Sequence, residues 1–240
     1  MKIELIFPVL NESKTLEAQI NKVKNHISKI DAYDFLITIV DNGSTDQTKV
    51  ISNKLIKQKM VNKYLYLPQK GRGRAIKLAI SKSNADIVSY MDIDLSTDLN
   101  SLLPLIESIT KENHDIAIGS RLSKGSNVIG RKKIREFTSR SYNLLIKFFF
   151  PFSRIDDMQC GFKAFSRLKI LKALNLVTNT KWFFDTEIII ISRHLNLSIY
   201  QLPVKWTDDP NTSVNIISTA IEDIIGLIKL RMKLLKKIVY

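Results

Sequence analysis

The chain has 240 residues, 45% of them apolar, and its 37 lysines and arginines outweigh 23 acids to give a net charge of +14. This length supports one α/β domain of generous size or two small ones, with a real core. The single cysteine, Cys160, excludes an internal disulfide, the three scattered histidines lack the spacing of a zinc site, and no apolar run reaches the ~18 residues of a membrane-spanning helix.

Apolar runs alternate with helical patterns through the first half of the chain. The expected strands are Ile3–Val9, Phe35–Val40, Lys63–Leu67, Asp86–Met91 and Asp115–Gly119. The expected helices between them are Ser13–Ile30, Asp46–Lys59, Arg72–Ser83 and Asp98–Glu112. This rhythm predicts an α/β fold with a mostly parallel central sheet and helices on both faces. In such sheets ligands bind beyond the carboxyl ends of the strands, which directs attention to the polar residues found there.

The rhythm becomes irregular from about residue 120. We expect a basic loop and an aromatic patch first, and the regular elements expected after them are a strand at Gly161–Phe165, a helix near Thr180–His194, a strand at Ile199–Val204 and a final helix within Val214–Tyr240. Nine basic residues lie between Arg121 and Arg154 against the single acid Glu136. Nucleic acid, anionic lipid headgroups and phosphorylated substrates are all partners that such a charge can attract.

Two acids, Asp92 and Asp94, come immediately after a short apolar run. In an extended segment residues i and i+2 lie on the same side, so both carboxylates can converge on one point. Close anions repel unless a cation lies between them, and a hard divalent cation such as Mg²⁺ or Mn²⁺ is the usual solution. Such an ion commonly takes its other ligands from substrate phosphates, so a nucleotide diphosphate is a natural partner. The alternative is a solvated strand end, where the acids simply stop the sheet.

Eight motifs together resemble one enzyme family. Four fall in the order and spacing of family 2 glycosyltransferases: Pro8-Val-Leu-Asn-Glu12, Val40-Asp-Asn-Gly-Ser-Thr-Asp46, Lys70-Gly-Arg-Gly-Arg-Ala75 and Met91-Asp-Ile-Asp94. Four more resemble the polyprenyl-phosphate branch, which contains dolichyl-phosphate β-glucosyltransferases and mannose synthases: Gly119-Ser-Arg121, Asp157-Met-Gln-Cys-Gly-Phe-Lys163, Trp182-Phe-Phe-Asp-Thr-Glu187 and Val204-Lys-Trp-Thr207. The resemblance implies the GT-A fold, a nucleotide-sugar donor, a Mg²⁺ or Mn²⁺ cofactor and inversion at the anomeric carbon.

The resemblance also implies a division of the chain and roles for its residues. Residues 1–213 are expected to form the catalytic domain, with a nucleotide-sugar half (1–119) and an acceptor half (120–213), and residues 214–240 a basic amphipathic helix. The residues expected to bind the donor are Pro8, Asn11, Glu12, Asp41, Lys70 and Asp92. Those expected to act in catalysis are Asp94, Asp157 and Asp185, with Asp92 and Asp94 on the metal and the other two as orienting carboxylates or bases.

The expected acceptor, a polyprenyl phosphate, is already an ionised nucleophile, so a strong general base is not obligatory. Its phosphate needs cations, and Arg121, Arg131 and Arg135 in the basic stretch are the candidates. The alternative for each arginine is solvated surface charge. Glucose from UDP-glucose is the favoured sugar, with mannose from GDP-mannose or transfer to a cell-surface polysaccharide as alternatives.

Two departures from the family pattern bear on the donor site. The second motif commonly carries two adjacent acids, but here the second is Asn42, and relatives often place a basic residue after the serine near position 213, where this chain has Val214. A catalytically inactive partner protein is therefore an alternative, although the intact Asp92 and Asp94 argue against it. A basic nucleic-acid-binding protein is another, but acids crowd the expected cleft and no nucleic-acid module is present, so we expect no nucleic-acid partner.

The last helix is expected to contact a membrane surface. Its apolar residues step by three or four along one stripe: Ile217, Ile221, Ile224, Ile228, Met232, Leu235 and Val239. The run Asn143–Phe152 is too short to span a bilayer but apolar enough to enter its interface. The alternative for the helix is packing on the catalytic domain or in the seam of a homo-oligomer. Without a signal peptide or a span, we expect a cytoplasmic protein, peripheral on the cytoplasmic face of a membrane.

Overall fold

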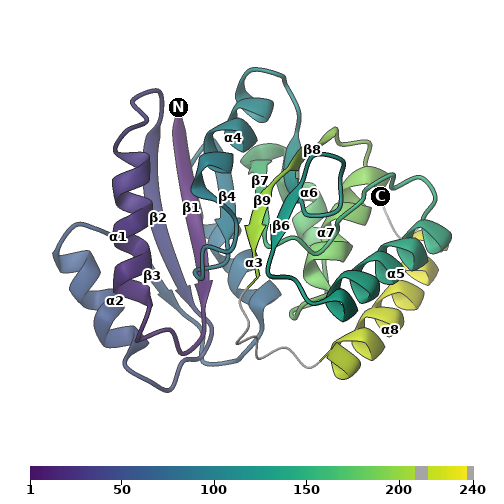
Figure 1. Cartoon of the computed structure of the whole chain (residues 1–240), viewed down its shortest axis with the longest axis horizontal. Helices are drawn as coiled ribbons and strands as arrows, with labels where there is room; N and C mark the ends of the chain where they lie inside the picture. Colours follow the sequence, from purple (N-terminus) through teal and green to yellow (C-terminus); the bar gives the residue numbers. More distant parts are fainter. Residues whose placement is uncertain (209–215, 237–240) are drawn as a thin grey trace.

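Within residues 1–208 and 216–236, which are the residues that the computed structural model describes, seven strands form one central sheet (Figure 1). Their order is β3-β2-β1-β4-β7-β5-β8. The strands are β1 (Lys2–Val9), β2 (Asp34–Asp41), β3 (Lys63–Tyr66), β4 (Ile87–Met91), β5 (Ile116–Ser120), β7 (Phe162–Ser166) and β8 (Ile199–Pro203). Only β7 among them runs antiparallel to its neighbours. The predicted α/β fold with a mostly parallel sheet is confirmed.

Helices cover both faces of the sheet and divide the core into two apolar clusters. One face carries α1 (Leu16–Ile27), α2 (Thr48–Lys57) and α4 (Leu102–Thr110), the last preceded by a short 3-10 turn at Leu99–Ser101. The other carries α3 (Arg72–Lys82), α6 (Arg167–Leu176) and α7 (Phe184–His194). Because both faces are covered, an inner strand such as β4 is buried along its whole length, and its sequence is apolar except for Ser89.

Two further helices, α5 (Lys133–Phe149) and α8 (Ile216–Leu235), pack against each other beside α7 (Figure 1). A small second sheet joins β6 (Asn127–Ile129) to β9 (Lys205–Thr207). A bridge from Thr97 to Trp206 attaches this small sheet to the segment that follows β4. This part of the molecule is therefore built from segments far apart in the sequence.

The carboxyl ends of β1, β2, β4 and β5 are oriented the same way, and they place the polar motifs at one edge of the sheet. Pro8 lies near the end of β1, beyond the last residue pair that β1 forms with β4, Ile6 with Tyr90. A proline there removes no ladder hydrogen bond on the β4 side, which explains how this inner strand tolerates it.

The structure corrects the expected loop between Arg121 and Arg154, because α5 occupies half of it. Asn143 and Ile146 of this helix are buried and Tyr142, Leu145 and Phe149 pack partly buried against the core, whereas Ile134, Phe137, Leu144 and Phe148 are exposed. Apolar residues therefore lie on more than one face of the helix, and the sequence shows no single inward stripe. The helix α6 was not predicted either. Of the expected final helix, residues 214, 215 and 237–240 lie outside the described residues.

Candidate active site

Asp92 and Asp94 follow β4 and line the same small cavity, together with Ser96, Gly161 and Trp206. Asp94 is exposed, and its Oδ1 accepts a hydrogen bond from the backbone N–H of Ser96 at 3.0 Å. Asp92 is half-buried, and its Oδ1 accepts hydrogen bonds from the Nε of Arg72 at 3.1 Å and from its Nη2 at 2.8 Å. The two carboxylates thus line one cavity, but across a turn at Ile93 and Asp94 and not along the extended segment that was expected.

Gly161 leaves the room that the Asp92 carboxylate occupies. A Cβ at this position would collide with Oδ2 of Asp92 and would lie 3.0 Å from Nη2 of Arg72. The glycine is required by close approach, since any larger residue would have to displace the carboxylate or the guanidinium. Gly161 belongs to the motif that precedes β7, so this motif and the Asp92 motif form one site.

A buried ion network connects Asp92 to a second carboxylate, Asp185, at the start of α7. Arg72 donates to Asp92 with one edge and to Oδ2 of Asp185 with Nη1. Oδ1 of Asp185 accepts hydrogen bonds from Nζ of Lys163 at 2.6 Å and from the Tyr90 hydroxyl. Burial alone would raise the pKa of Asp185, but Lys163 and Arg72 hold it below its ordinary value. The arrangement suits an orienting carboxylate better than a base, which needs a pKa near the working pH.

Hydrogen bonds join the loop after β1 to the loop after β2. Oδ1 of Asn11 accepts from the Thr45 N–H at 2.8 Å, and Oδ2 of Asp46 accepts from the Ser13 N–H at 3.1 Å. Asn11 adopts a left-handed backbone with φ of 58°, a conformation that asparagine tolerates better than most residues. These contacts fix the shape of the edge before any ligand arrives.

Asp41, predicted to contact a base or ribose, is wholly buried. Its Oδ1 accepts from the Ser44 N–H at 2.8 Å and its Oδ2 from the Tyr64 hydroxyl at 2.7 Å. Burial and the hydrogen bond to Asp41 raise the pKa of Tyr64. Glu12 is half-buried in the adjacent loop, and its Oε2 accepts from the Thr15 hydroxyl at 2.8 Å. Asp41 therefore shapes the wall of this region through its partners.

The Lys70–Ala75 motif forms the turn into α3. Gly71 has φ of 154°, and its N–H donates to Oδ1 of Asn42 at 2.5 Å, so the residue that departs from the family pattern holds the glycine turn. Gly73 packs so closely on Phe184 that a Cβ would lie 2.5 Å from that side chain. Lys70 is exposed beside this turn. The motif supplies the buried Arg72 in addition to flexible backbone.

The residues around Asp92 and Asp94 fit a hard divalent cation. The described residues contain no cluster of three or more histidine, cysteine, aspartate or glutamate side chains that could enclose a metal. Two carboxylates sharing one cavity give an oxygen donor set with positions left for other ligands. That is the arrangement in which Mg²⁺ or Mn²⁺ takes its remaining ligands from water and substrate phosphates.

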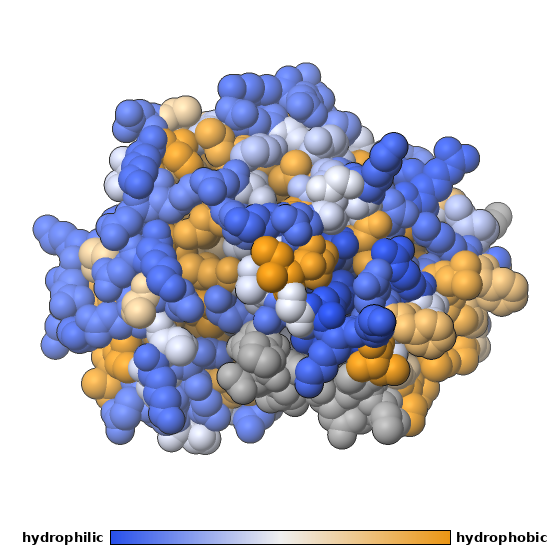
Figure 2. All heavy atoms as spheres, in the orientation of Figure 1, coloured by the Kyte–Doolittle hydropathy of each residue, from blue (hydrophilic) through white to orange (hydrophobic). Residues whose placement is uncertain are grey.

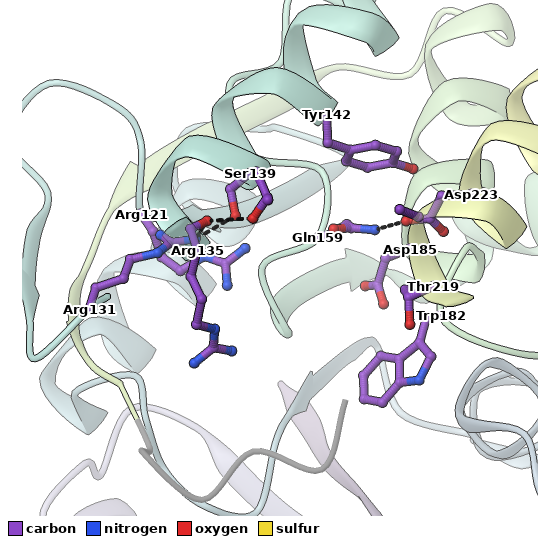
Figure 3. Close-up of a pocket in the computed structure, with 12 residues that line it drawn as sticks. Arg121, Arg131, Arg135, Ser139, Tyr142, Gln159, Trp182, Asp185, Thr219 and Asp223 are labelled. Atoms are coloured by element: carbon purple, nitrogen blue, oxygen red, sulfur yellow. Dashed lines mark hydrogen bonds between the residues drawn. The ribbon is translucent and has the colours of Figure 1, made fainter. Parts of the chain in front are cut away.

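A cavity of about 210 Å³ lies beside this network (Figure 3). Basic side chains line one side of it, whereas amide, carboxylate and aromatic side chains line the other. The basic residues are Arg121, Arg131 and Arg135, and those facing them are Tyr142, Gln159, Trp182, Asp185, Thr219 and Asp223. The three arginines expected for an acceptor phosphate are thus brought together on the wall of one cavity, which we call the arginine cavity.

Arg121 is held by Asp157, which was predicted as an orienting carboxylate or base. Nε and Nη2 of Arg121 donate to the two oxygens of Asp157 at 2.7 and 2.8 Å, and the guanidinium lies 4.9 Å from the centre of the Trp206 ring. Asp157 is fully buried. Burial alone would raise its pKa, but Arg121 lowers it, so the carboxylate stays ionised in this pair. Its geometry suits the fixing of Arg121.

Arg131 differs from Arg121 because part of its guanidinium lacks a partner. Nη2 donates to the Ser139 hydroxyl at 2.5 Å, but Nε and Nη1 are buried without any hydrogen bond among the described residues. Burial and the nearby Arg121 lower the pKa of Arg131. Arg135, at the start of α5, pairs with Asp208 at 2.5 Å. An anion entering the cavity would relieve both the repulsion and the missing hydrogen bonds of Arg131.

Sequence reasoning overlooked several residues of this cavity. Asp223 of α8 and Tyr142 of α5 were not predicted to line a site, and Arg72 was treated only as part of a pocket wall. The signal for Asp223 was present, since it lies in line with Leu227 and Leu230 on the buried row of α8. An acid in that row indicates either an internal partner or a ligand.

The predicted stripe of α8 faces outward. Ile221, Ile224, Ile228, Met232 and Leu235 are exposed, as are Ile134, Phe137, Leu144 and Phe148 of the adjacent α5. We call these nine residues the apolar face, and Figure 2 shows apolar side chains gathered on this part of the molecule. The side chain of Ile217 and residue Val239 lie outside the described set. No helix among the described residues has the length and hydropathy needed to cross a bilayer.

Comparisons with known proteins agree with this geometry. The sequence pattern of glycosyl transferase family 2 matches residues 4–174. Among curated relatives, glycosyltransferase AglD of Haloferax volcanii is 30% identical over 229 residues, covering 95% of this chain but 36% of AglD, so the chain spans about a third of that protein. The dolichyl-phosphate beta-glucosyltransferase of Dictyostelium discoideum is 28% identical over 97% of this chain and 75% of its own length.

Solved structures share the fold. Glucosyl-3-phosphoglycerate synthase from Mycobacterium tuberculosis in complex with UDP superposes with a TM-score of 0.68 and 20% identity over 96% of this chain and 80% of that one. The same enzyme has been solved with Mn²⁺, UDP-glucose and phosphoglyceric acid, at a TM-score of 0.67 and 20% identity over 96% of this chain and 79% of that one. At this identity the likeness establishes the GT-A fold alone.

Proposed function

Starting from a chain that belongs to glycosyl transferase family 2, we propose that it transfers a hexose, most simply glucose from UDP-glucose, to the phosphate of a dolichyl or other polyprenyl phosphate. The observation that carries this proposal is the incompletely bonded Arg131 in a cavity lined by three arginines. A phosphate monoester is the acceptor that such a cavity fits best. The curated relatives named dolichyl-phosphate beta-glucosyltransferase support the same acceptor and sugar.

The acceptor phosphate would lie against Arg131, with Arg121 and Arg135 held around it by their carboxylate partners. One of its oxygens attacks the anomeric carbon from the face opposite the leaving nucleotide diphosphate, which inverts that carbon. The attacking oxygen carries no proton at neutral pH, so the site needs no base with a tuned pKa. The low pKa values of Asp157 and Asp185 are consistent with this requirement.

The donor would bind at the edge formed by the β1, β2 and β4 ends, with Asp92 and Asp94 holding a divalent cation against its pyrophosphate. That cation would neutralise the charge developing on the departing nucleotide diphosphate. Arg72 holds Asp92 in place from the buried side, and Gly161 leaves space for the carboxylate. The loops carrying Asn11, Glu12 and Asp41 would form the nucleotide wall, with Lys70 at its rim.

The protein would work as a peripheral enzyme on a membrane surface. The apolar face of α5 and α8 offers side chains to the acyl region, and neighbouring lysines such as Lys133, Lys229 and Lys236 offer charge to anionic headgroups. Arg135, Tyr142 and Asp223 of the arginine cavity come from the same two helices. A polyprenyl chain could therefore remain in the bilayer while its phosphate reaches Arg131.

Transfer of radiolabelled sugar into organic-extractable lipid tests this function. Purified protein is incubated with a polyprenyl phosphate, Mn²⁺ or Mg²⁺, and either UDP-glucose or GDP-mannose, with EDTA as a control. We expect EDTA-sensitive label from UDP-glucose in the lipid phase. Label from GDP-mannose alone would change the sugar to mannose, and no lipid label from either donor despite donor binding would contradict the lipid acceptor.

A further inference from the structure

Asp223 places a buried carboxylate on the wall of the arginine cavity. It lies on α8, beyond the residues 4–174 that the family pattern covers, and it is 3% exposed. Nε2 of Gln159 donates a hydrogen bond to its Oδ2 at 2.6 Å (Figure 3). Its Oδ1 is buried and has no hydrogen-bond partner among the described residues. A buried polar atom of this kind is unfavourable unless a ligand or water satisfies it.

The charge around Asp223 disfavours an anion as that ligand. Among the described residues Asp223 forms no ion pair, and the arginines lie across the cavity from it in Figure 3. Burial, with the nearby Glu222 and Asp185, raises its pKa to about 7. A phosphate would be repelled from the ionised group and attracted to the opposite wall. A neutral donor such as a hydroxyl is the group that a lone carboxylate oxygen can accept from in this position.

A chain of ion pairs connects the expected donor site to the cavity that Asp223 lines. Asp92 pairs with Arg72, Arg72 pairs with Asp185, and Asp185 lines the cavity together with Asp223. Gln159, the partner of Asp223, is two residues from Gly161, which touches Asp92. These links place Gln159 and Asp223 next to the residues expected to hold the donor, and Trp182 adds an aromatic surface to the same cavity.

We propose that Asp223 recognises the sugar in transfer, its Oδ1 accepting a hydrogen bond from one hydroxyl of the hexosyl group while Gln159 fixes Oδ2. The C-terminal helix thereby contributes a specificity-determining residue to the catalytic domain. This inference rests on the proposed function, since it takes the ligand to be a nucleotide sugar. The transfer step itself is unchanged: the phosphate–sugar bond forms as the bond to the nucleotide diphosphate breaks.

The test combines an isosteric variant with donors that lack one hydroxyl. In Asp223→Asn, Gln159 would hold the amide oxygen, so an NH₂ group replaces the oxygen that accepts the hydroxyl proton. Glu222→Gln is the matched control, because Glu222 is exposed on the same helix and pairs with Lys181 outside the cavity. Each protein is assayed with UDP-glucose and GDP-mannose and with the corresponding donors deoxygenated at one position at a time.

We expect one deoxy donor to lower kcat/KM about 10- to 100-fold in the wild type and in Glu222→Gln, as loss of a hydrogen bond to a charged group does. The same donor should change kcat/KM less than about threefold in Asp223→Asn, because the contact is already lost. Equal losses in all three proteins, or unaltered kcat/KM for the complete donor in Asp223→Asn, would overturn the assignment.

Calorimetry of the same donors separates this inference from the proposed function. The wild type should bind the complete nucleotide sugar more tightly than the deoxy form, and Asp223→Asn should bind both alike. This binding pattern without transfer to lipid would contradict the lipid acceptor and leave the role of Asp223 standing. Transfer to lipid, with the loss caused by each deoxy donor the same in the wild type and in Asp223→Asn, would support the lipid acceptor and contradict the role of Asp223.

Discussion

The edge of the sheet at the ends of β1 and β2 and the cavity lined by three arginines satisfy their polar side chains in different ways. Asn11, Asp41 and Asp46 at the sheet edge are bonded to the neighbouring loop or strand. In the arginine cavity, Arg131 and Asp223 leave buried nitrogen and oxygen atoms without partners among the described residues. Hydrogen bonds within the protein therefore fix the shape of the sheet edge. The arginine cavity instead keeps a cation that lacks hydrogen bonds on one wall and an acid that lacks one on the other. Such atoms indicate where ligands supply the missing hydrogen bonds.

Asp94→Ala should have the largest effect, because it removes one of the two carboxylates expected to hold the cation. We expect transfer to fall about 1,000-fold, the several kcal/mol that a metal contributes to such a transition state. The measurement is radiolabel transfer to lipid, with Asp98→Asn as a control for loss of a nearby acid. Wild-type transfer by Asp94→Ala would disprove the metal assignment.

Gly161→Ala should lower kcat about 100-fold with the fold retained, because the new Cβ would displace the Asp92 carboxylate. Thermal unfolding checks the fold, and a double-variant cycle with Asp92→Asn checks the cause. The double variant should be little less active than the less active of the two single variants. Fully multiplied losses would show that Gly161 acts independently of Asp92.

Replacing two exposed residues of the apolar face, Phe148→Ser with Ile228→Ser, should weaken binding to anionic lipid vesicles about 30-fold. The estimate is about 2 kcal/mol for apolar side chains withdrawn from the bilayer. Because both side chains face solvent, the midpoint of thermal unfolding should change little. Leu168→Ser, at an exposed leucine of α6 outside the apolar face, is the control. An equal loss in the control would contradict a specific membrane face.

The smallest expected effect is a gain in stability from Asp223→Asn at pH 8. In the folded protein the pKa of Asp223 is about 7, whereas its ordinary value, expected in the unfolded chain, is 3.8. Because the folded state binds the proton more tightly, the free energy of unfolding of the wild type falls as the pH rises from about 4 to about 7. The variant lacks this loss and should melt about 3 °C higher at pH 8, but not at pH 4. Identical melting of the two proteins at pH 8 would show that Asp223 carries no burial penalty.

Much of the fold could be predicted because each inner strand of the first half is a short, mostly apolar run followed by polar turn residues. The helix α5 could not, since its apolar residues lie both on an inward row with Ile146 and on the exposed side, at Phe137 and Phe148. Asp92 and Asp94 line one cavity as expected, but they do so across a turn and not along the extended segment on which the expectation depended. The partnership of Arg72 with Asp185 joins residues 113 positions apart, and no local pattern contains that information.

The distant partners also explain why sequence reasoning could place arginines near a phosphate but could not rank them. Arg121 and Arg135 are paired with Asp157 and Asp208, whereas Arg131 is left with unbonded nitrogen atoms. This ranking depends on tertiary contacts and makes Arg131 the residue on which acceptor binding should depend most.

The most direct measurement is therefore calorimetric binding of geranyl phosphate, a short water-soluble prenyl phosphate, to the wild type and to Arg131→Met. The exposed Lys124, in the same basic stretch but outside the cavity, supplies the control Lys124→Met. We expect binding to weaken about 30- to 100-fold in Arg131→Met, as loss of charge-assisted hydrogen bonds to phosphate predicts, and to be unchanged in the control. Equal affinity in the wild type and Arg131→Met would contradict the assignment of this cavity to the acceptor phosphate.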